Sequence, residues 1–211
     1  YDMIHEVKRR GLHLTLITNL VAADAARIVA LGVDQLLIGI HGASLVTYGQ
    51  FHPNFVKEEW ARLLGMLAEF HRAGRRYKHV HVICRYNAHE LIEMVRLGAM
   101  YGAEQINFKL ASLRDGTEQV RISEAQRLQL QSELVPRAMA EAEQHQLPTN
   151  LDVFLQQLRA GEEATASIAD VGCFMGYAYS RILVDGTVLY CCNTDVKVGS
   201  LATGASFSEL W

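Results

Sequence analysis

Four short β-rich runs, each followed by an amphipathic stretch long enough for a helix, occupy the first 148 residues. The predicted strands are 14–18, 35–41, 80–86 and 105–111. Connections of 11 or more helical residues are crossovers, so the pattern predicts a parallel sheet covered on both faces. The fold class is therefore α/β, and both a doubly wound sheet and part of a (β/α) barrel fit the alternation.

The predicted helices are indicated by residues typical of helix ends as well as by the periodic spacing of their apolar residues. Glycine closes several of them, Ser123 is a predicted N-cap, and Pro136 is expected to kink the last long helix. The predicted helices are 1–11, 22–32, 55–73, 88–102 and 123–145. A short helix and a small-residue linker then break the pattern, and we place a domain boundary near residue 160, between a core (1–160) and an extension (161–211).

Polar residues gather where the predicted strands end. Both candidate architectures place their chemistry at the carboxyl ends of parallel strands. The residues at these ends are Thr18, Asn19, His41, Gly42, Arg85, Tyr86, Asn87, Lys109, Ala111 and Ser112. A second interpretation stays open, in which the asparagines and the serine only cap the turns and helices that follow.

The composition excludes several classes of function. A net charge of −3 and no basic run interleaved with aromatic residues argue against nucleic acid as a partner. No apolar stretch approaches a membrane span, and the first residues lack the apolar centre of a signal peptide, so we expect a cytoplasmic protein with no membrane contact. The chain begins at Tyr1 without a methionine, and we expect it to be part of a longer protein.

Three of the four cysteines lie at the ends of one predicted hairpin. Its strands are 177–184 and 187–192, joined by a two-residue Asp185-Gly186 turn that pairs Val184 with Thr187 and Ser180 with Cys191. Cys173 can then fold back toward Cys191, whereas Cys191 and Cys192 point to opposite faces if the strand continues through both. Thiolates bind iron-sulfur clusters or zinc, although buried core cysteines or an oxidised vicinal pair also fit the spacing.

The same segment resembles a known family. Cys173, twelve residues, Gly186, four residues and Cys191 fit the C-x(9–15)-G-x4-C opening of the SPASM or twitch extension of radical S-adenosylmethionine (SAM) enzymes. The continuation DGTVLYCCNTDVKVGSLATGASFSELW is similar to that extension as well. Upstream, KRRGLHLTLITN resembles the step into the third strand of the family's barrel, and VICRYNAHELIEMVRLGAMYGAEQINF resembles its fifth strand and the helix leading to the sixth.

The resemblance implies a partial (β/α)6 TIM-like barrel of about four βα units followed by a small β-hairpin extension. It implies S-adenosylmethionine and 4Fe-4S clusters as cofactors, a 5′-deoxyadenosyl radical that abstracts hydrogen from a peptide or small-metabolite substrate, and an electron donor such as flavodoxin or ferredoxin. Carried onto this chain, the implied cofactor-binding residues are Asn19, His41, Arg85 and Asn87, and the implied ligands of an auxiliary cluster are Cys173, Cys191 and Cys192.

The sequence also departs from the family pattern. It contains no C-x3-C-x2-C motif, so we expect this chain alone to be inactive. In the fourth strand of the barrel, Gly39-Ile40-His41-Gly42 stands where many relatives carry S-x-D-G. Two alternatives remain: a non-catalytic α/β binding module, and a zinc-stabilised domain that keeps only the fold.

Overall fold

A computed structural model describes the chain except for residues 53–55, 114–115, 161–176, 178 and 192–195. The chain divides into two compact units, Tyr1–Thr165 and Ala166–Trp211, which are described separately below. Within the described ranges, no helix is both long and apolar enough to cross a membrane.

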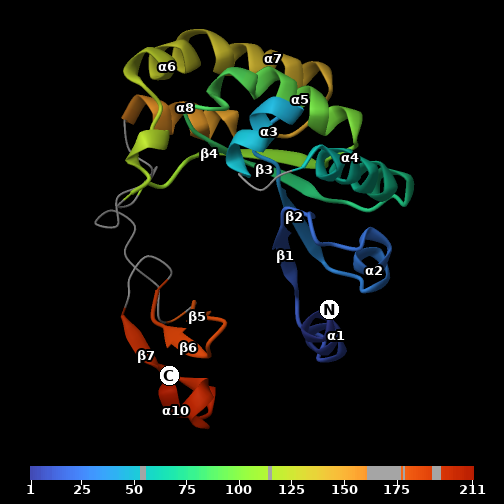
Figure 1. Ribbon diagram of the computed structural model, residues 1–211, viewed down its shortest axis with the longest axis vertical. Coiled ribbons are helices and arrows are strands. Elements are labelled where there is room, and N and C mark those ends of the chain that lie inside the picture. Colours follow the sequence, from blue (N-terminus) through green and yellow to red (C-terminus); the bar gives the residue numbers. More distant parts are fainter. Residues whose placement is uncertain (53–55, 114–115, 161–176, 178, 192–195) are drawn as a thin grey trace. The chain divides into compact units, whose positions relative to one another are not determined.

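The larger unit is built on a four-stranded parallel sheet (Figure 1). Its strands are β1 (Thr15–Thr18), β2 (Gln35–Gly39), β3 (Lys78–Ile83) and β4 (Gln105–Leu110). Each strand pairs with the one before it, in the order β1-β2-β3-β4. A doubly wound sheet reverses its strand order at a switch point, whereas a (β/α) barrel adds strands in sequence. The order therefore confirms the partial TIM-like barrel and removes the doubly wound alternative.

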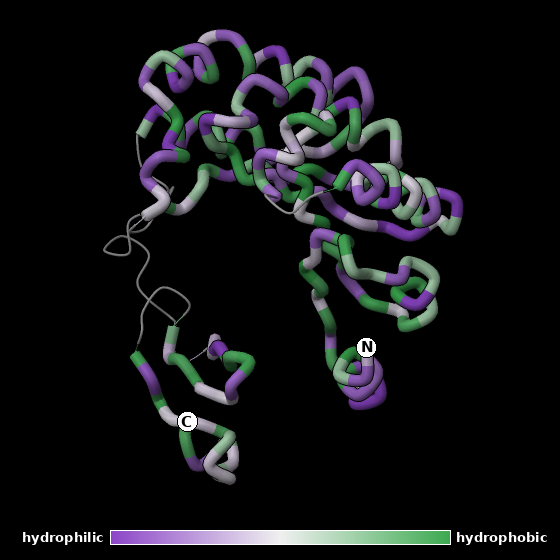
Figure 2. The backbone as a smooth tube through the Cα atoms, in the orientation of Figure 1, coloured by the Kyte–Doolittle hydropathy of each residue, from purple (hydrophilic) through white to green (hydrophobic). Residues whose placement is uncertain are grey.

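Helices precede and follow these strands along the chain, and several lie together over the sheet (Figure 1). The α-helices are α1 (Asp2–Arg9), α2 (Ala25–Ala30), α3 (Leu45–Phe51), α4 (Lys57–Arg72), α5 (Leu91–Met100), α6 (Glu124–Gln129), α7 (Val135–Gln144) and α8 (Leu151–Ala160). Short 3-10 turns lie at Ala88–Glu90 and Glu118–Val120. Helix α1 buries none of its residues, and Figure 2 shows much of this first segment as hydrophilic.

The two faces of the sheet differ in burial. Residues that alternate along each strand pack into the core beneath the helices and are fully buried, such as Leu36 and Ile38 on β2 and Ile106 and Phe108 on β4. The residues between them are more exposed, and we call the surface that they form the inner face. Its members are Thr15, Ile17, Gln35, Leu37, Gly39, Lys78, Val80, Val82, Gln105, Asn107 and Lys109. The expectation that both faces of the sheet are covered is therefore wrong for the described residues, in which the inner face is the surface open to ligands.

Two helical features differ from the sequence expectation. Helix α3 lies between the predicted strand 35–41 and the predicted helix 55–73, where no helix was predicted, and the Ser44 side chain caps it by accepting a hydrogen bond from Thr47 N–H. The predicted 123–145 helix begins at the Ser123 cap as expected, but Leu130–Leu134 form a π-helical turn directly before Val135 and Pro136. A proline removes one backbone donor, and the wider turn accommodates that loss.

Asn150 closes the free edge of β4. Its side-chain Oδ1 accepts a hydrogen bond from Phe108 N–H at 2.7 Å, and its Nδ2 donates to the Phe108 carbonyl at 2.8 Å. Thr149 adds a single parallel bridge to Ile106. An exposed strand edge invites pairing with other chains, and here a side-chain amide satisfies it.

The smaller unit holds a three-stranded antiparallel sheet of β5 (Arg181–Ile182), β6 (Thr187–Leu189) and β7 (Lys197–Ser200), followed by a 3-10 turn (Leu201–Thr203) and α10 (Phe207–Leu210). The predicted hairpin register is wrong by one residue, because Ile182 pairs with Val188 and Leu183 N–H donates to the Thr187 carbonyl. The turn therefore has three residues and ends at Gly186, whose φ of 81° suits the left-handed position of such a loop.

Candidate functional site

Asn87 ties together the carboxyl ends of β2 and β3. Its side chain is fully buried, its Oδ1 accepts a hydrogen bond from Cys84 N–H at 2.8 Å, and its Nδ2 donates to the carbonyls of Val82 at 2.8 Å and His41 at 3.0 Å. Both amide hydrogens are thus used within the protein. The geometry makes Asn87 a residue that shapes the rim of the sheet, while its predicted contact with a cofactor stays a prediction.

Glu90 supports the same rim and was missed in the sequence analysis. Its carboxylate is 7% exposed and accepts hydrogen bonds from Ala43 N–H at 2.7 Å, Ser44 Oγ at 2.7 Å and Thr47 Oγ1 at 2.8 Å. These bonds hold the segment between β2 and the start of α3. A signal was present in the sequence, because helical spacing places position 90 on the same apolar side as Met94.

His41 closes the ladder between β2 and β3. The last backbone hydrogen bond between these strands is donated by Ile40 N–H to the Val80 carbonyl. The next backbone donor, Val82 N–H, donates instead to Nδ1 of the His41 ring at 3.3 Å. The ring then lies over Gly39, where an added Cβ would be 3.4 Å from Nε2. His41 therefore sits on the inner face at its carboxyl end.

The surroundings of His41 keep its imidazole uncharged. Burial, together with the charges of His52 and Lys109, lowers the pKa of His41 to about 4. Since Nδ1 accepts a hydrogen bond, the proton of the neutral ring is on Nε2. At neutral pH the residue offers an N–H donor, and it does not act as a cation.

Asn19 lies at the end of β1. It is exposed, and its Oδ1 accepts a hydrogen bond from Val21 N–H at 3.2 Å. Together with Thr18 it lines a pocket of about 280 Å³, whose other lining residues are Tyr1, Ile4, Leu16, Ala22, Ala23 and Ile28. The turn interpretation and a role in lining a pocket are thus both compatible with its position.

Arg85 follows β3 and is exposed. Its Nη1 donates to the Gln119 carbonyl at 3.2 Å, and its guanidinium carbon lies 5.9 Å from the centre of the Tyr86 ring. Its own carbonyl accepts a hydrogen bond from Gln126 Nε2 at 2.8 Å. Among the described residues, Arg85 thus contacts Tyr86, the segment that leads into α6 and α6 itself, and it makes no hydrogen bond with His41 or Asn19.

One of the three predicted cluster ligands lies in the described part of the chain. Cys191 is half-buried just beyond β6, whereas Cys173 and Cys192 fall outside the described residues. Cys84 is 2% exposed, and burial raises the pKa of its thiol, as expected of a core cysteine. The described residues contain no group of three or more potential metal ligands. They supply one of the predicted thiolates, which by itself does not hold a cluster.

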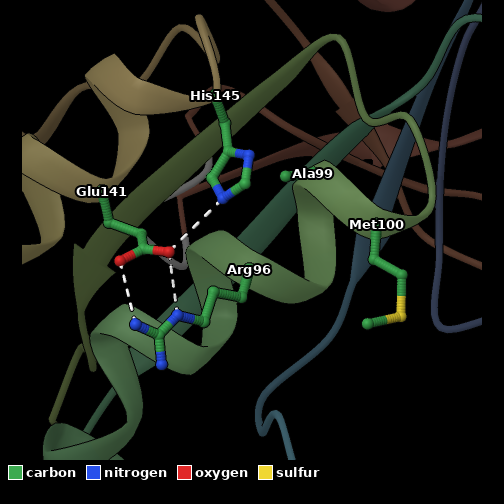
Figure 3. A pocket seen from close by; sticks show the side chains of 5 residues that line it. All are labelled: Arg96, Ala99, Met100, Glu141 and His145. Carbon is green, nitrogen blue, oxygen red and sulfur yellow. Dashed lines mark hydrogen bonds and ion pairs between the residues drawn. The ribbon is translucent and has the colours of Figure 1, made fainter.

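A second pocket, of about 380 Å³, lies between α5 and α7 (Figure 3). Arg96 binds the Glu141 carboxylate through two hydrogen bonds of 2.8 and 3.0 Å, and His145 Nε2 lies 3.3 Å from the same carboxylate. The hydrogen bond from Arg96 lowers the pKa of Glu141. Ala99 and Met100 complete the lining. The charged groups of this pocket bind one another, and the ion pair between Arg96 and Glu141 links α5 to α7.

No family model and no curated protein matches the sequence. Solved structures do match. Streptococcus suis SuiB, bound to S-adenosylmethionine, covers 100% of this chain at a TM-score of 0.66 and 14% identity. The structure of anSMEcpe with AdoMet and a Kp18Cys peptide covers 99% at a TM-score of 0.63 and 12% identity. A domain of the pyruvate-formate lyase-activating enzyme from Bacteroides vulgatus covers 71% at a TM-score of 0.51 and 17% identity.

The shared architecture of these neighbours decides the fold. This chain has the fold of radical SAM enzymes. It covers 50% of the SuiB chain, 61% of anSMEcpe and 86% of the activating-enzyme domain. In the radical SAM fold, the strand ends that carry Asn19, His41 and Asn87 are the carboxyl end of the barrel sheet.

Proposed function

We propose that the chain is part of a radical SAM enzyme that generates a 5′-deoxyadenosyl radical and uses it to abstract hydrogen from a substrate. The observation that carries the proposal is the sequentially ordered parallel sheet, in a chain whose fold is similar to that of SuiB bound to S-adenosylmethionine. In this assignment, residues 1–160 belong to the barrel core and 161–211 begin the auxiliary extension. The enzyme would work in the cytoplasm with a flavodoxin or ferredoxin as electron donor.

Within this proposal, Asn19 and His41 line the cofactor and substrate space, Asn87 holds the strand ends beneath it, and Arg85 borders it. When bound, a reduced 4Fe-4S cluster supplies the electron that cleaves S-adenosylmethionine. Cys173, Cys191 and Cys192 are the proposed protein ligands of an auxiliary 4Fe-4S cluster, on the basis of their sequence spacing.

A peptide is the substrate class we favour. SuiB has been solved with the precursor peptide SuiA, and anSMEcpe with a Kp18Cys peptide. An inner face that is open and carries amide and ammonium groups suits an extended chain with polar side chains better than a compact apolar metabolite.

The test is anaerobic reconstitution of the full parental protein with iron and sulfide, followed by addition of S-adenosylmethionine and dithionite. We expect cluster absorbance, acid-labile sulfide and release of 5′-deoxyadenosine. Cys191→Ala is expected to lower the iron and sulfide content, whereas Cys84→Ala, which removes a core thiol, leaves both unchanged. Zinc without sulfide, or no 5′-deoxyadenosine from a fully loaded protein, refutes the proposal.

A further inference from the structure

We propose that Lys109, Asn107 and His41 form a carboxylate-binding subsite on the inner face, to which the substrate presents an acidic side chain or a chain terminus. The inference deepens the proposed function, on which it rests, by naming the group through which the substrate is held. All three residues are in the described part of the larger unit, and each contributes a hydrogen-bond donor.

The register of the sheet places the three residues together. Gly39 pairs with Val80, which pairs with Asn107, so these positions form one row across β2, β3 and β4. Neighbouring strands are about 4.8 Å apart, so the backbones at the two ends of this row are about 10 Å apart. The His41 ring lies over Gly39 and the Asn107 side chain rises from the other end of the row. The gap between them is one that a carboxylate can bridge.

Lys109 stands beside the same space, one step nearer the carboxyl end. It pairs with Val82, whose N–H group holds the His41 ring. Lys109 is exposed and alternates with the buried Phe108, which places its side chain on the inner face. Its charge is also one of the causes that depress the pKa of His41, as expected for neighbouring groups.

Two hydrogen bonds fix the direction in which the neutral groups donate. Because Nδ1 of His41 accepts from Val82, the ring proton is on Nε2, which has no hydrogen-bond partner among the described residues. Asn107 Oδ1 accepts from Gln105 Nε2 at 3.1 Å, which leaves the Nδ2 hydrogens of Asn107 to donate to a ligand. An ammonium group and two N–H donors suit an anion and leave a cation without an acceptor.

The charge of the inner face favours an anion as well. Its strand positions carry two lysines and three carboxamides, and no aspartate or glutamate. Lys78, the other lysine, pairs with Gln105 near the amino end of the strands, four residues before Val82. The Glu90 carboxylate reaches the loop after β2, where three donors already engage it. The subsite is therefore a local feature of the carboxyl end.

The experiment uses the chain itself and the imidazole resonances of His41. Sodium acetate is the probe, acetamide is its neutral counterpart, and long-range ¹H–¹⁵N spectra report the Nε2 resonance at constant ionic strength. We expect a saturable shift with acetate and none with acetamide. Lys109→Met is expected to weaken acetate binding about tenfold or more, because it removes a hydrogen bond between charged groups.

Lys78→Met is the matched control, since it removes the same charge from the same face at the opposite end. We expect it to change acetate affinity less than about twofold. Absence of saturation, or equal losses in the two lysine variants, overturns the subsite. S-adenosylmethionine is a further probe: if it shifts Nε2 in a manner that depends on Lys109, the carboxylate belongs to the cofactor and the substrate assignment is overturned. Acetate binding needs no cluster, so its failure leaves the radical proposal standing.

Discussion

We expect two imidazoles buried in the core to make the larger unit sensitive to acid. His79 and His81 on β3 are both 0% exposed, and none of their ring nitrogens has a hydrogen-bond partner of ordinary geometry among the described residues. The rings pack on each other with centroids 5.6 Å apart, and His81 also stacks on Phe108 at 5.4 Å. A charged imidazole there would lose its hydration without gaining a partner.

The magnitude follows from proton linkage. Burial lowers the pKa of His79 to about 3 and that of His81 well below its usual value, with the nearby backbone of Ile40 opposing part of the effect on His81. The unfolded chain takes up protons near pH 6.5 and the folded chain does not, so stability is full above pH 6.5 and falls as the pH decreases. pH 5 is about 1.5 pH units below the pKa of an unfolded histidine, and each pH unit corresponds to about 1.4 kcal/mol. At pH 5 the free energy of unfolding is therefore lower by about 2 kcal/mol for each ring and by about 4 kcal/mol for both.

The measurement is urea unfolding at pH 7.5 and pH 5.0, followed by circular dichroism at 222 nm, which reports the helices of the larger unit. We expect the double variant His79→Leu/His81→Leu to lose about 4 kcal/mol less between the two pH values than the natural chain does. His5→Gln, at an exposed position, is the control for the removal of a histidine from the surface. Equal pH dependence of the double variant and the natural chain would refute the reasoning, whatever their stabilities at pH 7.5.

Three further substitutions test the packing and the rim in the same unfolding assay at pH 7.5. Glu90→Ala leaves buried donors unsatisfied and should cost about 3 kcal/mol, whereas Glu93→Ala on the exposed side should stay within about 0.5 kcal/mol. Gly98→Ala places a Cβ 2.4 Å from an isoleucine side chain and should cost about 1–3 kcal/mol, while Gly65→Ala meets nothing within 4 Å and should stabilise α4 by about 0.5–1 kcal/mol. Asn150→Ala should cost about 1–3 kcal/mol by exposing the β4 edge, and an unchanged midpoint would contradict that role.

Much of the fold could be predicted from periodicity and from residues with special backbone needs. The four strands were found within a few residues because their apolar runs are β-rich and their connections are helical. Helix α3 was missed because its short LVTYGQF segment offers a weak apolar period next to Pro53. The Ser44 cap and packing against α4 stabilise this helix. A short stretch of sequence does not reveal such packing between distant segments.

The rim of the site was predicted as a set of positions, but the roles of its members were not. Asn87 and His41 were placed at strand ends because parallel strands end together. Which of their polar atoms are free for a ligand depends on partners about 40 residues away in the sequence. The Asn87 side chain donates to the His41 carbonyl, and the His41 ring accepts a hydrogen bond from Val82 N–H. Those pairings follow from strand register, which the pattern of single strands does not specify.

The cysteine hairpin shows how one residue of register changes a chemical argument. In a continuous strand, adjacent side chains point to opposite faces, so Cys191 and Cys192 would diverge. In the structure β6 ends at Leu189, and Tyr190 N–H donates to the Val196 carbonyl of the segment leading into β7. Cys191 therefore lies beyond the ladder that β5 and β6 share, and Cys192 lies outside the described residues. Because the turn has three residues and ends at Gly186, the expected pairing of Ser180 with Cys191, from which the approach of Cys173 to Cys191 was inferred, is not formed.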